Sequence, residues 1–312
     1  EGVVGVATGL SKNGDVVVKV FTVQGETGKI PARLEDVRIE LEKTGKFRAL
    51  QRAVPRPRPP RPEVVDRREF QPRAVPIGVS VGPEYWMPGG GYWAGTLGCR
   101  VKDRDGNLYA LSNNHVFADN GAVPIGTPIL QPGLLETDGV VRYGESQVIG
   151  YLKKYIPIVM NDASRPNRVD AAIASCTAAT VGKRTLSDGY GAYKSTPVKA
   201  YLGQRVQKYG RTTGYTRGFV VEAVEGTFAV GYGGGNTAWF TGQIGIFGTA
   251  GLFSTSGDSG SLVVTDSAPS SRRARPEVRH PVGLLFAGGG GWTDANPIED
   301  VLKAFDVTID GE

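Results

Sequence analysis

The sequence has few of the residues that hold metals or disulfide frameworks, and no run long enough to cross a membrane. It contains two cysteines and two histidines in 312 residues. Cys99 and Cys176 are too few for a disulfide framework and make no metal-ligand spacing; we expect two buried thiols, with one disulfide as the alternative. No apolar run approaches the ~18–20 residues that span a bilayer. The sequence therefore implies no metal, no organic cofactor and no membrane partner.

Excess positive charge is confined largely to two short stretches rich in arginine. The net charge of +5 is thus a property of linkers, and it does not predict a nucleic-acid partner. Aromatic residues, which would stack on bases, are not interleaved with these arginines. The chain begins at Glu1 with no visible signal segment, and the low cysteine count slightly favours the cytoplasm. The oligomeric state stays open, a homo-oligomer included.

Glycine is abundant and helical periodicity is scarce. The 45 glycines are about twice the usual share, and from Ile77 onward short apolar runs alternate with glycine-rich turns. This pattern is typical of an antiparallel barrel or sandwich. The predicted strands are Trp93–Val101, Leu108–Ser112, Val148–Tyr151, Val169–Ser175, Arg205–Tyr209, Gly218–Val224, Ser261–Val264 and Val282–Phe286.

The end of the chain changes to a helical period. Asn296 can cap a helix that has Pro297 at its first position. Four apolar residues then fall on one face, at Ile298, Val301, Leu302 and Phe305. We expect an amphipathic helix that docks on the strands.

Two smaller segments precede the strand-rich domain of residues 77–312. Residues 1–50 predict a small α+β unit with two hairpin strands, a short helix and a third strand, at Val3–Ala7, Asp15–Val23, Pro31–Val37 and Arg38–Glu42. Residues 51–76 interleave proline with arginine and predict an extended, polyproline-like linker. A ligand for a proline-binding domain is the alternative for this linker.

The string Ser256-Gly257-Asp258-Ser259-Gly260-Ser261 is the most specific candidate for chemistry. A serine attacks only when a base takes its proton and donors stabilise the oxyanion. Glycines on both sides allow the turn that aims the amides of Gly257 and Ser259 at one point. An ordinary Gly/Ser-rich loop is the alternative.

The candidate base and acid are chosen from the histidines and aspartates in the sequence. If Ser259 needs a base, His115 at a strand end is nearly the only choice, because His280 lies beside a basic loop. Asp170 begins an apolar strand, where a carboxylate is costly without a partner. We favour it over three acids in polar, turn-like surroundings, Asp119, Asp138 and Asp162. The order His, Asp, Ser is that of the chymotrypsin-type triad.

The sequence resembles the trypsin-like serine peptidases of chymotrypsin fold over about residues 76–310. More narrowly, it is similar to a mainly bacterial subgroup that has a plant relative, the narrow-leaf type peptidase. The stretches that carry the resemblance are GTLGC (95–99), SNNHVFA (112–118), ILQPG (129–133), NRVDAAIA (167–174), KYGRTTG (208–214), FSTSGDSGSLVV (253–264), VGLLFAGG (282–289) and ANPIEDVL (295–302). IPARLEDVRIELEKTG (30–45) also resembles a unit that often precedes such domains.

The resemblance implies a mostly β chain with two six-stranded antiparallel barrels and the site in their cleft. His115 would be the general base and then the general acid, Asp170 would orient it, and Ser259 would be the nucleophile. The amides of Gly257 and Ser259 would form the oxyanion hole. Together these features predict a serine endopeptidase that acts on protein or peptide substrates; the alternative is a dormant peptidase fold that binds peptides.

The resemblance also implies where a peptide would bind. The strand Leu284–Gly288 would pair with an extended substrate by strand addition. Phe253 stands where trypsins carry an acid, and beside Ala287 it suggests a small or apolar side chain before the scissile bond. The candidate substrate-binding residues are Phe253, Ser254, Leu285, Phe286, Ala287 and Gly288.

One departure from the family concerns activation. Digestive relatives bury a newly cut N-terminus against the acid that precedes the nucleophile. Glu1 lies behind a whole unit and a proline-rich linker. We therefore expect Asp258 to find arginine or backbone donors instead.

Overall fold

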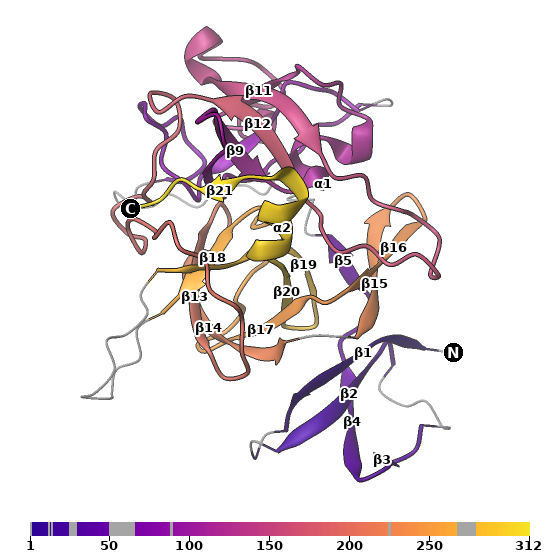
Figure 1. Cartoon of the computed structure of the whole chain (residues 1–312). Coiled ribbons are helices and arrows are strands. Elements are labelled where there is room, and N and C mark those ends of the chain that lie inside the picture. The colour runs from indigo at the N-terminus through magenta and orange to yellow at the C-terminus, as the bar shows by residue number, and fades with distance from the viewer. Residues whose placement is uncertain are drawn as a thin grey trace, which may run out of the picture.

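The computed structural model describes residues 2–11, 13, 15–24, 30–49, 66–87, 90–223, 226–266 and 279–312. In this part of the chain nearly all regular structure is strand, arranged in two sheets (Figure 1). The helical segments are short: α1 Asn114–Phe117, α2 Ile298–Phe305, and three turns of 3₁₀ helix at Asp119–Gly121, Leu134–Glu136 and Gly144–Gln147. None of the described helices is long and apolar enough to cross a bilayer.

The first sheet is antiparallel and has the strand order β21, β8, β9, β12, β11, β10, β6 and β7. Its strands are β6 Ser80–Pro83, β7 Gly95–Thr96, β8 Cys99–Lys102, β9 Leu108–Ser112, β10 Pro128–Leu130, β11 Val148–Tyr155, β12 Ala172–Cys176 and β21 Thr308–Ile309. The chain runs from β7 directly into β8 through Leu97 and Gly98: Gly78 N–H, before β6, donates to Leu97 O (2.7 Å), and Gly98 N–H donates to Leu111 O of β9 (3.0 Å). The sheet thus curls into a barrel.

The second sheet contains a closed barrel of six antiparallel strands. These are β13 Arg205–Gly210, β14 Gly214–Ala223, β17 Ile244–Gly248, β18 Leu262–Thr265, β19 Pro281–Gly289 and β20 Trp292–Pro297. The barrel closes because β18 pairs with both β13 and β19. All four residues of β18 are buried, as expected for a short apolar run in a core. A hairpin of β15 Thr227–Gly233 and β16 Asn236–Thr241 extends this sheet.

These two barrels confirm the predicted fold class, a mostly β chain of the chymotrypsin-like type. The C-terminal helix is confirmed as α2, which buries the four predicted apolar residues. The predicted cap is wrong: Pro297 is the N-cap residue and no side chain caps the helix. The Asn296 side chain instead accepts a hydrogen bond from the backbone of Asp170.

The described residues of the N-terminal unit form strands only. They are β1 Val3–Leu10, β2 Val16–Thr22, β3 Arg33–Leu34, β4 Val37–Lys43 and β5 Phe47–Ala49. The helix predicted over Pro31–Val37 is wrong, because β3 and β4 pair as a tight hairpin. Glu35 in its turn has φ +50°, which lies outside the right-handed helical region. Figure 1 shows β1 to β4 beside the second barrel and β5 reaching up between β15 and β19.

The linker lies partly outside the described residues, which omit 50–65. Its described end, 66–76, lies against the first barrel: Gln71 N–H donates to Gln131 Oε1 (2.9 Å), and Val75 is buried. The second basic stretch is described only at Arg279. The boundaries at residues 50 and 76 remain predictions. Cys99 and Cys176 are free thiols, so the disulfide alternative is wrong in this structure.

Candidate active site

Two neighbouring strands of the first barrel bring His115 and Asp170 together. β9 ends at Ser112, directly before the α1 turn that carries His115, and Ser112 is opposite Ala172 of β12. His115 Nδ1 lies 2.5 Å from Asp170 Oδ2, and the His115 N–H donates to Asp170 Oδ1 at 3.2 Å. Both side chains are almost fully buried. The structure thus contains the predicted imidazole–carboxylate pair.

Tyr232 is a third member of this cluster, and the sequence analysis missed it. It lies on β15, and its hydroxyl donates to Asp170 Oδ2 at 2.8 Å. Burial, reinforced by the neighbouring carboxylate, raises the pKa of Tyr232 well above its ordinary value, so it stays a donor. The Asp170 carboxylate therefore accepts three hydrogen bonds, which compensate for removing its charge from water.

The backbone of Asp170 is held by side chains that the sequence analysis also missed in this role. Asn113 Nδ2 donates to Asp170 O (2.7 Å), and the Asp170 N–H donates to Asn296 Oδ1 (2.9 Å). Asn296 Nδ2 in turn donates to Gln243 Oε1 at 2.6 Å. The carboxylate is thus positioned by a network that spans both barrels.

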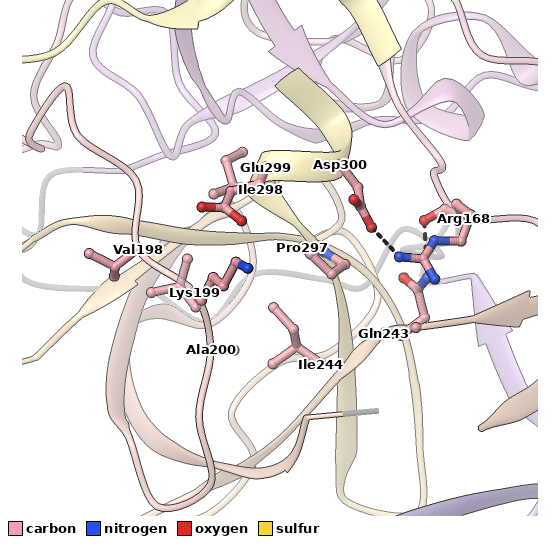
Figure 2. A pocket seen from close by; sticks show the side chains of 12 residues that line it. Arg168, Val198, Lys199, Ala200, Gln243, Ile244, Pro297, Ile298, Glu299 and Asp300 are labelled. Carbon is pink, nitrogen blue, oxygen red and sulfur yellow. Dashed lines mark hydrogen bonds and ion pairs between the residues drawn. The ribbon is translucent and has the colours of Figure 1, made fainter. Parts of the chain in front are cut away.

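Figure 2 shows the outer end of this network at a pocket of about 290 Å³. Gln243 Nε2 donates to the carbonyl of Arg168 (3.0 Å), and Arg168 pairs with Asp300 at the start of α2 (2.7 Å). None of the three predicted triad residues lines this pocket. Its side chains Gln243 and Asp300 instead hold Arg168, two residues before Asp170.

The Ser259 turn is fixed to both barrels by its backbone. Thr96 N–H of the first barrel donates to Ser259 O (2.8 Å), and Gly260 N–H donates to Leu285 O of the second (2.8 Å). Gly260 has φ +93°, and a Cβ there would lie 2.2 Å from Thr96 O. Only glycine fits this position.

The Ser259 turn lies beside the segment that carries His115, since a Cβ on Gly95 would lie 2.6 Å from Val116 Cγ2 and 3.0 Å from Ser259 O. Ser259 Oγ donates to Phe286 O of β19 at 3.2 Å. Three ring contacts connect His115 to Phe286, since His115–Tyr232, Tyr232–Phe240 and Phe240–Phe286 have centroids 6.0, 6.2 and 4.7 Å apart. The Ser259 turn and the His115–Asp170 pair thus both lie where the two barrels meet, and a catalytic contact between Ser259 and His115 stays a prediction.

The two amides predicted for an oxyanion hole stand in one turn. Gly257 has φ +94°, and Thr96 Oγ1 donates to its carbonyl at 2.9 Å. Among the described residues, no acceptor bonds to the N–H of Gly257 or of Ser259. Both amides are thus available as donors.

Asp258 anchors the turn through donors from within the chain. The N–H groups of Thr212, Thr213 and Thr255 donate to its carboxylate at 2.9, 3.1 and 3.0 Å, and the Thr213 hydroxyl donates at 2.8 Å. The backbone donors are as predicted. The cation is Lys208 rather than an arginine, with Nζ 3.9 Å from Asp258 Oδ2.

Lys208 is fully buried, and its ammonium group donates to Thr213 Oγ1 (2.5 Å) and Gly214 O (2.9 Å). Burial lowers its pKa to about 8, against the opposing attraction of Asp258. The Thr213 hydroxyl thus accepts a hydrogen bond from the ammonium group and donates one to the Asp258 carboxylate. The Asp258 carboxylate is thus held by donors and a cation from within the chain.

The alternative base and two of the alternative acids are near the surface. His280 Nδ1 contacts Thr196 O at 2.8 Å. Asp138 is exposed and pairs with Arg142 (3.5 Å), while hydrogen bonds from Ser164 lower the pKa of Asp162. Asp119 lies in the turn after α1, with φ +43°.

The predicted substrate-binding residues occupy two different environments. Phe253 and Leu285 are fully buried in the core of the second barrel, and Ser254 Oγ bonds Thr293 Oγ1 at 2.7 Å. The other three predicted residues, Phe286, Ala287 and Gly288, lie in β19. Two of them, Ala287 and Gly288, are paired with β5 of the N-terminal unit.

This arrangement contains groups that acyl transfer uses. A buried carboxylate lies against one ring nitrogen of a histidine, and the turn that carries Ser259 has two amides with no acceptor among the described residues. Within the described residues, no group of three or more His, Cys, Asp or Glu side chains is placed to hold a metal.

Comparison with known proteins gives similarity in structure only. No family model matches the sequence, and no curated protein matches it. Among solved structures, the chain is similar to Thermobifida fusca protease A (19% identity, TM-score 0.48, covering 76% of this chain and 98% of that one) and to Nocardiopsis protease (15%, 0.48, 75% and 97%). It is also similar to Cellulomonas bogoriensis chymotrypsin (16%, 0.43, 70% and 91%).

Proposed function

We propose that the protein is a serine endopeptidase that hydrolyses peptide bonds through an acyl-enzyme. The observation that carries the proposal is the short His115 Nδ1–Asp170 Oδ2 contact beside the Ser259 turn. A carboxylate at Nδ1 holds the proton on that nitrogen, so Nε2 is the nitrogen that takes the serine proton.

The reaction follows from these positions. Ser259 Oγ turns from Phe286 O toward His115, loses its proton to Nε2 and attacks the substrate carbonyl carbon. The amides of Gly257 and Ser259 stabilise the resulting oxyanion. A single donor of this kind lowers the free-energy barrier by about 3 kcal/mol. The imidazolium then protonates the leaving amine, and water repeats the sequence to release the acid.

The subgroup of serine peptidases to which the chain would belong is a proposal that rests on its sequence motifs. SNNHVFA (112–118) and FSTSGDSGSLVV (253–264) support the mainly bacterial subgroup with the plant narrow-leaf type relative. The protease names of the similar structures support protein or peptide substrates.

Labelling by a small serine-directed phosphonate tests the proposal. Ser259→Ala should abolish labelling while the unfolding temperature changes little. Ser256→Ala, in the same loop, is the matched control and should label at the wild-type rate. Equal labelling of Ser259→Ala and wild type would overturn the assignment and leave a peptide-binding role.

A further inference from the structure

β5 of the N-terminal unit fills a slot between two strands beside Ser259. Ala49 and Arg48 are opposite Ala287 and Gly288 of β19 in antiparallel register. On the other side, β5 runs parallel to β15, with Arg48 opposite Gly231. We call the space between β15 and β19 the β15–β19 slot; Figure 1 shows β5 within it.

β5 runs antiparallel to β19 and toward the side of Ser259. From Arg48 to Ala49 the register moves from Gly288 to Ala287, which is toward Phe286, the residue whose carbonyl holds Ser259 Oγ. An extended peptide adding to β19 forms the same antiparallel ladder. β5 therefore uses the backbone groups that a substrate would need.

The fit is close on both sides of the slot. Phe47 is 1% exposed, and its ring lies 5.4 Å from Phe21 and 5.1 Å from Phe228 of β15. A Cβ on Gly289 of β19 would lie 3.1 Å from the carbonyl of Lys46. Because burial of a large apolar side chain is favourable, Phe47 anchors the strand.

We infer that the N-terminal unit is an intramolecular inhibitor whose strand β5 competes with peptide substrates for the β15–β19 slot. The inference rests on the proposed peptidase function and names the regulation of its site. A tethered segment has an effective concentration of roughly millimolar. Even a weak strand interaction then keeps the slot filled until the unit moves away.

Peptide binding to the Ser259→Ala chain tests the slot without any chemistry. The probe is a fluorescent peptide with the sequence of residues 43–49, KTGKFRA. Arg48→Pro removes a backbone donor that a central strand needs, so we expect at least about tenfold tighter binding than in the Ser259→Ala parent. Arg48→Ala keeps the backbone pairing and should bind like the parent, as should Arg33→Pro at the remote β3 edge.

A second variant removes the anchor of β5 and leaves β15 and β19 unchanged. Phe47→Ala takes away the ring that packs on Phe21 and Phe228, so it should weaken the hold of β5 and also strengthen peptide binding. Circular dichroism and thermal unfolding confirm that each variant is folded. Equal peptide affinity in the parent, Arg48→Pro and Phe47→Ala would overturn the inference.

Labelling of the chain with Ser259 intact separates this inference from the proposed reaction. Arg48→Pro should react at least tenfold faster with a peptidyl phosphonate, which needs the slot, and at an unchanged rate with a small phosphonate, which does not. Tighter peptide binding with no labelling would support the slot and overturn the reaction. Labelling without tighter binding would overturn the slot alone.

Discussion

Replacing Asp170 by asparagine tests the mechanism at one atom. Asp170 Oδ2 accepts from His115 Nδ1 and Tyr232 OH, and Oδ1 accepts from the His115 N–H. With the asparagine oxygen at the Oδ2 position, its NH₂ group would oppose the His115 N–H, so two donors would face each other. The reversed amide satisfies every group, because the Tyr232 hydroxyl can turn to accept. It then donates to Nδ1 and places the ring proton on Nε2, the nitrogen that should act as base.

The Asp170→Asn chain should therefore fold and react slowly. The corresponding change in the chymotrypsin-type template lowers kcat about 10⁴-fold, which corresponds to roughly 5 kcal/mol of barrier. The assay is the rate of labelling by a small phosphonate, with thermal unfolding as the check on folding. Asp162→Asn, at the alternative acid, should label like wild type. A folded Asp170→Asn chain that labels within tenfold of wild type would refute the tautomer argument.

Two further predictions concern buried groups outside the triad. Burial raises the pKa of Asp294 well above its ordinary value, so the stability it contributes is present below about pH 4 and lost as the pH rises. Asp294→Asn should then raise the free energy of unfolding in urea by about 1–3 kcal/mol at pH 7 and change it little at pH 4. Asp105→Asn, at an exposed position, should leave the free energy of unfolding unchanged at both pH values. Equal stability of Asp294→Asn and wild type at pH 7 would contradict this prediction. Burial also raises the pKa of Cys176 to about 12 and that of Cys99 further. Because the thiolate is the reactive form, Ellman's reagent at pH 8 should react slowly with the native chain and quickly with two thiols in guanidinium; a fast native thiol would contradict it.

The parts of the fold that the sequence predicts are those whose signal is local. The strand predicted at Leu108–Ser112 is β9 with the same bounds, because a short apolar run between turn residues reports its own burial. The sequence also identifies His115, Asp170 and Ser259 in that order, because each lies in a recognisable sequence motif. The structure brings His115 and Asp170 together, and the approach of Ser259 to His115 stays a prediction.

The sequence does not predict contacts whose partners lie far along the chain. Asn296 stands in a local helix-capping pattern, yet its side-chain oxygen accepts a hydrogen bond from the backbone N–H of Asp170, 126 residues away. A buried amide without an acceptor costs roughly 1–3 kcal/mol, about as much as an N-cap contributes, and the helix start can use water. Tyr232 carries no local signal at all, because only the β15 hairpin brings it to the carboxylate.

The anchor of Asp258 and the strand β5 together indicate which step of activation the chain controls. A peptidase can be kept inactive by a disordered oxyanion turn or by a blocked substrate site. Here Thr212, Thr213 and Lys208 already hold the Asp258 carboxylate, and the Gly257 turn already has its donors available, so no new N-terminus is needed to order it. On the proposed function, what would separate this structure from a substrate complex is the presence of β5 in the β15–β19 slot. Removing that occupant leaves the catalytic groups where they are, and the rate with small probes and the rate with peptides should then respond differently.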